Sequence, residues 1–239
     1  MKSLGVYVIN LQSRPDRLAA ISNQLSERAI DFIRVEACTP ENTYYPNLSP
    51  SVGAIYHSHK IAMEQFINST FDFALILEDD ALLDERVDFS SLINCAGSEF
   101  DFIQVGFLKN NLIDHFEIIY FNLRRKFIVV SFRIASKLFR ESKLVQDSRR
   151  RLTIREHLLF PPDWVSSNIQ AGAHAYIVSK NFAAKTLEFA ANPFLAIDDF
   201  YMALGRMRLV AMYRLKKSRV SQSNSRSDVV KRFKMNLED

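Results

Sequence analysis

Three consecutive carboxylates follow an apolar run at residues 71–77. The run reads FDFALIL, and Glu78, Asp79 and Asp80 come directly after it. Like charges this close repel one another, so each carboxyl group resists being charged beside the other two. The usual compensation is a neighbouring Lys or Arg, or a metal ion. Hard cations such as Mn²⁺ and Mg²⁺ prefer carboxylate oxygens, so the three acids are candidate metal ligands; the alternative is a set of surface or helix-capping acids.

A second acidic pair occupies a comparable position. Asp198 and Asp199 lie between the apolar run NPFLAI and a helical pattern. A lone pair of this kind more often caps the helix that follows. Two acidic clusters, each at the end of an apolar run, favour instead a cleft in which one cluster holds a metal ion and the other accepts a proton.

Strands that alternate with helices must position these acids. Apolar runs predict strands at 4–9, 31–37, 71–77, 101–107 and 173–179, and helical periodicity predicts helices that begin near Ser13 as N-cap, at 55–68 and at 180–190, with a loop at 39–52. This alternation indicates an α/β fold with a mainly parallel sheet flanked by helices. Ligands of such sheets bind beyond the carboxyl ends of the strands. Asn10, the acids at 78–80 and the loop after Phe107 all follow predicted strands, so we expect one cleft.

The composition indicates one folded domain. Of the 239 residues, 48% are hydrophobic and 24% are charged, which is ordinary for a protein with a sizeable core. The N-terminal apolar run is too short for a secretory signal, and no stretch reaches the roughly 18 uncharged apolar residues of a membrane span. We therefore expect a single domain over residues 1–239 and a cytoplasmic location.

Basic residues gather in the segment 124–157. One helical face of this segment carries Phe127, Val130, Ile134 and Leu138, and the opposite face carries Lys126, Arg133, Lys137 and Arg140. The pattern predicts a cationic amphipathic helix within a basic helical insertion at about 109–165. Its basic face either is simply solvated or contacts an anionic surface, from membrane lipid or a phosphorylated acceptor.

Four sequence blocks, taken in order, resemble glycosyltransferase family 25, the lipopolysaccharide and lipooligosaccharide biosynthesis transferases. They are VYVINLQSRPDR, HSHKIAM, ALILEDDALL, and AGAHAYIVSKNFAAKTL with the AIDDF that follows it; VSQSNSRSDV is a weaker fifth. Two positions depart from the family pattern. VGAIYHSH lacks the Gly-Cys that usually precedes the Ser-His pair, and Ala173 replaces the usual Thr.

The resemblance implies a GT-A type fold, a UDP-hexose donor such as UDP-galactose or UDP-glucose, and inversion at the anomeric carbon. Mn²⁺ or Mg²⁺ held by Asp80, with Glu78 or Asp79 helping, would stabilise the leaving diphosphate. Asp198 is the first choice for the base that activates the acceptor hydroxyl, and Asp199 is the second. The acceptor is expected to be a glycolipid or oligosaccharide of the lipooligosaccharide type.

The nucleotide is expected to bind after the first strand. Under the resemblance, Asn10, Arg14 and Arg17 meet it, together with Asp79 and Gln222. The alternative for the first three is a salt bridge that only organises the start of the helix.

Two other functions are alternatives to glycosyl transfer. A sugar-phosphate nucleotidyltransferase needs a Gly-rich loop after the first strand, and NLQSRPDR contains no Gly. A non-enzymatic nucleic-acid-binding protein could use the basic segment 124–157. The acids at 78–80 and 198–199 would then be unexplained, so nucleic acid is not an expected partner.

The basic segment generates a testable prediction. If it recruits the protein to the inner face of the cytoplasmic membrane as a peripheral protein, four cations at about 1 kcal/mol each give reversible, salt-sensitive binding. The protein should co-sediment with anionic but not neutral vesicles, and reversing Arg133, Lys137 and Arg140 to Glu should abolish this. Transfer to a short soluble acceptor should survive. Equal binding to both vesicle types, or to neither, would leave the basic face as a solvated one.

Overall fold

The computed structural model describes residues 2–95, 100–107, 165–166, 172–189, 193, 195–206 and 209–223. The predicted amphipathic helix of segment 124–157 lies outside these residues, as does the predicted insertion at 109–165 apart from its last residue. Among the helices described, none combines the length and the hydropathy needed to cross a bilayer.

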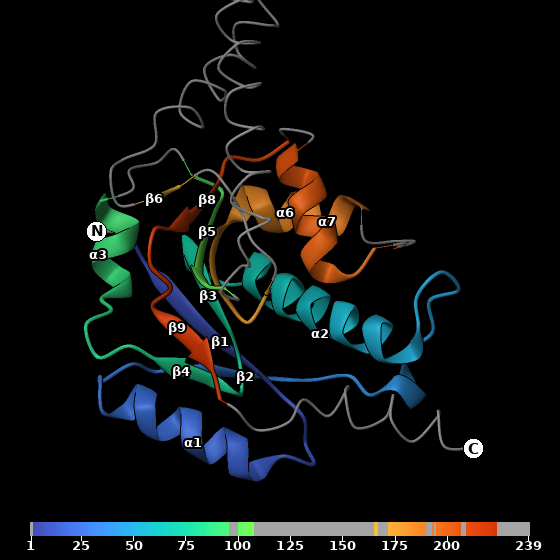
Figure 1. Cartoon of the computed structure of the whole chain (residues 1–239), viewed down its shortest axis with the longest axis horizontal. Coiled ribbons are helices and arrows are strands. Elements are labelled where there is room, and N and C mark those ends of the chain that lie inside the picture. Colours follow the sequence, from blue (N-terminus) through green and yellow to red (C-terminus); the bar gives the residue numbers. More distant parts are fainter. Residues whose placement is uncertain are drawn as a thin grey trace, which may run out of the picture.

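The described strands form one nine-stranded sheet (Figure 1). They are β1 (Leu4–Asn10), β2 (Ile33–Glu36), β3 (Phe73–Glu78), β4 (Ala81–Leu83), β5 (Phe102–Gly106), β6 (Val165–Ser166), β7 (Ala175–Ser179), β8 (Met212–Leu215) and β9 (Val220–Gln222). The main order is β2-β1-β3-β7-β5-β8-β6, and β9 bridges β4 and β5. The described helices are α1 (Pro15–Ser26), η1 (Pro40–Asn42), α2 (Pro50–Ile67), α3 (Phe89–Cys95), α6 (Lys180–Phe189) and α7 (Ile197–Arg206).

The sheet is mainly parallel, which confirms the predicted fold class. β1 pairs in parallel with β2 and β3, and β5 pairs in parallel with β8. β7 runs antiparallel to both of its neighbours, β3 and β5. The strands β1, β3, β5 and β8 therefore end at one edge of the sheet, which we call the carboxyl edge. Because β7 runs the other way, the residues just before it, from Gly172 to His174, also lie at this edge.

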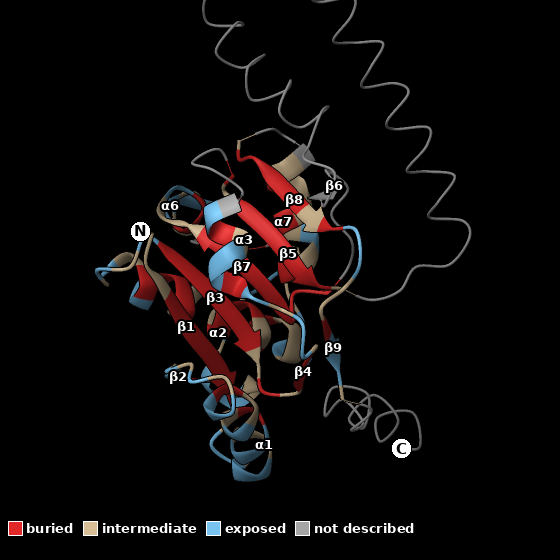
Figure 2. Ribbon diagram, turned by 90° about the vertical axis from the view of Figure 1, so that its left-hand side faces the viewer, coloured by how far each residue is buried: buried red, intermediate tan, exposed pale blue. Residues whose placement is uncertain are grey.

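Helices cover both faces of the sheet. Ile21 and Leu25 of α1 pack with Ile93 of α3 against one face, while Met63 of α2 and Tyr201 of α7 belong to the cluster on the other face. Figure 2 shows that the central strands between these layers are almost wholly buried. Both faces of β3 are thus apolar, which explains its uninterrupted hydrophobic run.

Two predicted helix starts were wrong. The N-cap position of α1 is Arg14 rather than Ser13, and no side chain caps this end. α2 begins at Pro50, inside the segment predicted as a loop. The ring of proline fits the first turn of a helix because its φ suits the helix and the missing N–H has no intrahelical acceptor there. Pro50 therefore begins a helix, although the other prolines nearby led the sequence analysis to predict a loop there.

A lysine of α6 donates hydrogen bonds to carbonyl groups at the C-terminal end of α2. Lys180 Nζ donates to the carbonyl oxygens of Phe66, Ile67 (2.9 Å) and Ser69 (2.9 Å), and it lies 4.4 Å from the centroid of the Phe66 ring. The last carbonyls of a helix lack intrahelical donors and carry partial negative charge. Partial burial lowers the pKa of Lys180 because it disfavours the charged ammonium group. The three carbonyl oxygens offset this desolvation cost, since each accepts a hydrogen bond from the ammonium.

Lys180→Met should therefore lower the free energy of unfolding by about 2–3 kcal/mol, since it removes charged hydrogen bonds and leaves three carbonyls without this donor. Denaturant unfolding followed by circular dichroism measures the change. Lys185→Met in the same helix is the matched control, because Lys185 only pairs with the exposed Glu188. Equal losses in the two variants would contradict the assigned role.

Candidate active site

The predicted site residues of two strands lie together at the carboxyl edge. Asn10 is the last residue of β1, Glu78 is the last of β3, and Asp79 and Asp80 form the turn into β4. Gln222 of β9 reaches the same turn, because β9 pairs with β4 through Ala81. The structure thus joins residues that are 144 positions apart in the chain.

Glu78 turns toward the face covered by α2. Its Oε1 lies 3.3 Å from Nε2 of His59, and its Oε2 accepts a hydrogen bond of 3.3 Å from Nε2 of Gln222. Burial opposes the charged carboxylate, but the hydrogen bond and charge of His59, with smaller contributions from His174 and Gln222, lower the pKa of Glu78. The negative charge of Glu78 is therefore compensated by His59 and, to a smaller extent, by His174 and Gln222.

Asp79 turns toward the face covered by α1. Its Oδ2 accepts a hydrogen bond of 2.8 Å from Asn10, and its Oδ1 lies 3.3 Å from Nη1 of Arg17. Burial nevertheless outweighs these partners and raises the pKa of Asp79. Asn10 is itself buried, and its amide also contacts Arg14 and Arg34. Asn10 is placed to position Asp79 and the start of α1.

Asp80 differs from the two acids before it. Its Oδ1 is buried and has no hydrogen-bond partner among the described residues. Burial, followed by the negative charges of Glu78 and Asp79, raises the pKa of the Asp80 carboxyl to about 6, although Arg17 and Gln222 act in the opposite direction. The backbone is fixed by the bond from Ser223 N to the Asp80 carbonyl at 2.8 Å. Asp80 thus presents an uncompensated carboxylate oxygen.

The three acids do not form one cluster. Within the described part of the chain, no group of three or more His, Cys, Asp and Glu side chains is arranged to hold a metal ion. Glu78 and Asp79 point to opposite faces and have protein partners, which leaves Asp80 as the acid best suited to an added cation.

Asp198 lies in the first turn of α7, and it accepts a hydrogen bond of 2.8 Å from the backbone N–H of Gly172. Gly172 has a φ of 109°, a conformation that residues with a side chain rarely adopt. Burial is the main cause of the raised pKa of Asp198, and the charges of Glu78 and Asp199 add to it against that of His59. Asp199 is exposed. Of the two predicted bases, Asp198 is the one held within the fold.

A buried hydrogen-bond chain connects α7 to the acidic turn. The hydroxyl of Tyr201 lies 3.1 Å from that of Tyr176 on β7, and the Tyr176 hydroxyl lies 2.6 Å from Nδ1 of His59. His59 contacts Glu78 through its other nitrogen. Sequence reasoning missed both tyrosines. The block HSHKIAM contains Ser58 and His59, and the block AGAHAYIVS contains Tyr176, so both blocks held a signal for these residues.

Arg14 and Arg17 lie at the start of α1, with different partners. Arg14 makes two hydrogen bonds to Asp16, at 3.0 and 2.9 Å, and these lower the pKa of Asp16 to about 2. The helix-start salt bridge considered from the sequence is therefore present for Arg14. Arg17 instead contacts Asp79, so it brings positive charge to the acidic turn.

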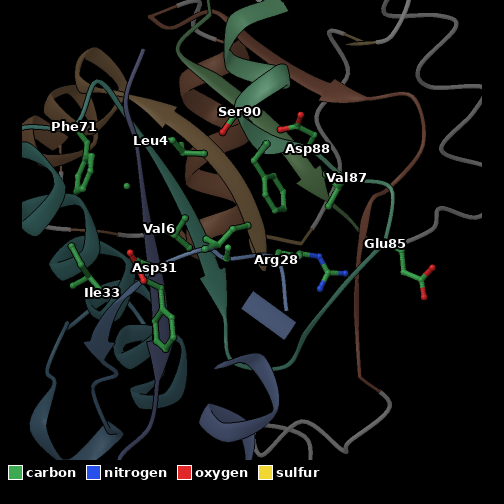
Figure 3. A pocket seen from close by; sticks show the side chains of 15 residues that line it. Leu4, Val6, Arg28, Asp31, Ile33, Phe71, Glu85, Val87, Asp88 and Ser90 are labelled. Carbon is green, nitrogen blue, oxygen red and sulfur yellow. The ribbon is translucent and has the colours of Figure 1, made fainter. Parts of the chain in front are cut away.

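A hollow of about 630 Å³ lies at the opposite edge of the sheet (Figure 3). Leu4 and Val6 of β1 contribute to its wall, with Arg28 and Asp31 from the loop before β2. Of the described residues that line it, none was predicted as a site residue. The carboxyl edge and this hollow are thus separate places.

The model of the family described as "Glycosyltransferase family 25 (LPS biosynthesis protein)" matches residues 3–201. The chain belongs to glycosyltransferase family 25. The match includes the acidic turn and both candidate bases, and it favours glycosyl transfer over the nucleotidyl transfer left open by the sequence. This family 25 chain has no match among curated proteins.

Among solved structures, this family 25 glycosyltransferase is similar to one described as a glycosyltransferase involved in the glycosylation of the major capsid of PBCV-1. The two share 8% sequence identity with a TM-score of 0.49, over 98% of this chain and 99% of the other.

Proposed function

We propose that this glycosyltransferase moves a hexose from a UDP-sugar to a hydroxyl of a lipooligosaccharide-type acceptor, with inversion and with the help of a divalent metal ion. The observation that carries the proposal is the buried Oδ1 of Asp80 at the carboxyl edge, which has no hydrogen-bond partner among the described residues. Ligands of mainly parallel α/β sheets bind at this edge.

The residues at the acidic turn fit a metal ion. A buried carboxylate oxygen without a donor, crowded by two further acids, is stabilised when a hard cation binds. Asp80 would be the principal ligand of Mn²⁺ or Mg²⁺, and Glu78 and Asp79 would add negative charge beside it. When bound, the ion would neutralise the charge that grows on the leaving diphosphate.

The nucleotide would lie beside the start of α1. Arg17 brings positive charge to Asp79, and Arg14 lies on the first turn of the same region. Asn10, which is buried, would act by positioning Asp79 and Arg14 rather than by direct contact. Gln222 orients Glu78 from β9.

Asp198 would accept the proton of the acceptor hydroxyl. As the acceptor oxygen attacks the anomeric carbon, the bond from that carbon to the diphosphate oxygen breaks. UDP leaves with the bonding electron pair, and the hydroxyl proton passes to Asp198. A base works best when its pKa lies near the working pH, and the raised pKa of the half-buried Asp198 moves it in this direction.

The metal assignment predicts the behaviour of Asp80→Asn. Without the carboxylate, metal-dependent release of UDP from a UDP-hexose should fall by about 10²–10³-fold or more, the scale for loss of one electrostatic group at a reacting centre. Electron paramagnetic resonance of Mn²⁺ should show that binding is lost while circular dichroism is unchanged. Asp31→Asn, an exposed acid at the opposite edge, is the control. Full activity in EDTA, or normal activity of Asp80→Asn, would refute the assignment.

The base assignment predicts a different pattern for Asp198→Asn. UDP-sugar binding should change by only a few-fold, while the rate of transfer should fall by about 10²–10⁴-fold. In the parent enzyme, kcat/KM should rise with pH through the pKa of Asp198, which lies above the ordinary aspartate value, and this acidic limb should vanish in the variant. If Asp199→Asn alone abolishes transfer, the two roles are exchanged; if neither variant does, the base is another residue.

A further inference from the structure

A half-buried arginine on β8, Arg214, plays no part in the chemistry proposed above. Arg214 is partly buried, and its Nε has no hydrogen-bond partner among the described residues. Among the described residues, its Nη1 donates to the carbonyl oxygen of the next residue, Leu215, at 3.0 Å. Burial lowers the pKa of Arg214, and no carboxylate of the described residues opposes this shift. Burial of a charge without a charged partner is costly, so the position calls for another explanation.

The side chain lies on the same face of the sheet as α7. Met212 belongs to the cluster packed against α2, α6 and α7, whereas Tyr213 and Leu215 belong to the cluster on the opposite face. Side chains alternate along a strand, so Arg214 shares the face of Met212. In the parallel pairing of β5 and β8, Arg214 is the register partner of Gln104.

An aromatic ring holds the guanidinium in place. The Cζ of Arg214 lies 5.0 Å from the centroid of the Phe107 ring, just beyond the carboxyl end of β5. Stacking of this kind fixes the plane of the fork and leaves N–H groups along its edge for an acceptor. Nε is among the donors still to be satisfied.

Arg214 is connected to the base only indirectly, through Gln104 and Gly172, and lies away from the metal. Gln104, its register partner, donates a hydrogen bond of 2.7 Å to the Gly172 carbonyl, and the N–H of Gly172 binds Asp198. In the order of strands, β8 is separated from β3 by β7 and β5. These three spacings amount to about 14 Å at about 4.8 Å each. A diphosphate at Asp80 is thus distant, so a ligand of Arg214 belongs to another part of the substrates.

We propose that Arg214 binds an anionic group, a phosphate or a carboxylate, of the acceptor saccharide and so selects acidic acceptors. The inference rests on the proposed function for the statement that the ligand is an acceptor. The planar fork of arginine matches both groups through paired hydrogen bonds. Ligand binding supplies the negative charge that the described residues near Arg214 do not.

Direct binding tests the proposal without requiring transfer. The full-length protein, with UDP and Mn²⁺ present to fill the donor site, is titrated calorimetrically with glucose 6-phosphate, glucuronate and glucose. At least one anionic sugar should bind about tenfold or more tightly than glucose, the scale of a charged hydrogen bond, and the tighter of the two identifies the group. Arg214→Gln should abolish the difference. Arg219→Gln should keep it, because Arg219 pairs with Asp84 on the surface.

Equal affinities for the three sugars in the parent protein, or a difference that survives in Arg214→Gln, would overturn the proposal. Thermal unfolding of Arg214→Met separates binding from a purely structural role. Because the variant removes a half-buried charge that has no charged partner among the described residues, its Tm should stay the same or rise; a fall of several degrees would assign Arg214 to the fold instead. If UDP-hexose turnover fails while the anionic preference holds, only the proposed function is lost. If turnover proceeds with no such preference, only the role of Arg214 is lost.

Discussion

The repulsion between three adjacent carboxylates organises this end of the molecule. Glu78 and Asp79 reduce this repulsion by turning to opposite faces of the sheet. There Glu78 contacts His59 of α2, and Asp79 contacts Arg17 of α1. Asp80 remains between them with a buried oxygen that has no donor among the described residues. Both helical layers and β9 therefore converge on a single turn. The alternation of side chains along a strand makes this division possible, since successive residues must diverge.

The same arrangement separates two kinds of carboxylate within one cleft. Asp80 is crowded by negative charge, whereas Asp198 is half-buried at the start of a helix and accepts a hydrogen bond from the N–H of Gly172. Environment rather than residue type gives two carboxyl groups different chemical behaviour. Tyr201 lies one turn after Asp198 on α7, and its hydroxyl begins the buried chain that reaches Glu78 through Tyr176 and His59. A buried hydrogen-bond chain thus connects the helix that carries Asp198 to the acidic turn.

The sequence predicted the parts of the fold that bury long apolar runs. β1, β3, β5 and β7 were found in this way, and the mostly exposed β2 was also predicted, within 31–37. β4, β6 and β9 have only two or three residues each, too few to show an apolar run, and β8 was missed because Arg214 interrupts its apolar residues. The site was harder, because sequence order places the acids together while the fold separates Glu78 from Asp79. Contacts such as His59 with Tyr176, 117 positions apart, depend on tertiary packing that no local pattern encodes.

The last described strand has a consequence for how the enzyme is made. β9 supplies Gln222 to Glu78 and the N–H of Ser223 to the Asp80 carbonyl, and its pairing with β4 spans most of the chain. During synthesis the acidic turn leaves the ribosome long before these partners do. Contacts of such sequence separation form late and carry the greatest loop-closure cost. The nascent chain therefore lacks the Gln222 contact to Glu78 and the Ser223 bond to Asp80 until its C-terminal part arrives, and a ribosome-bound fragment that ends before β9 has an incomplete acidic turn.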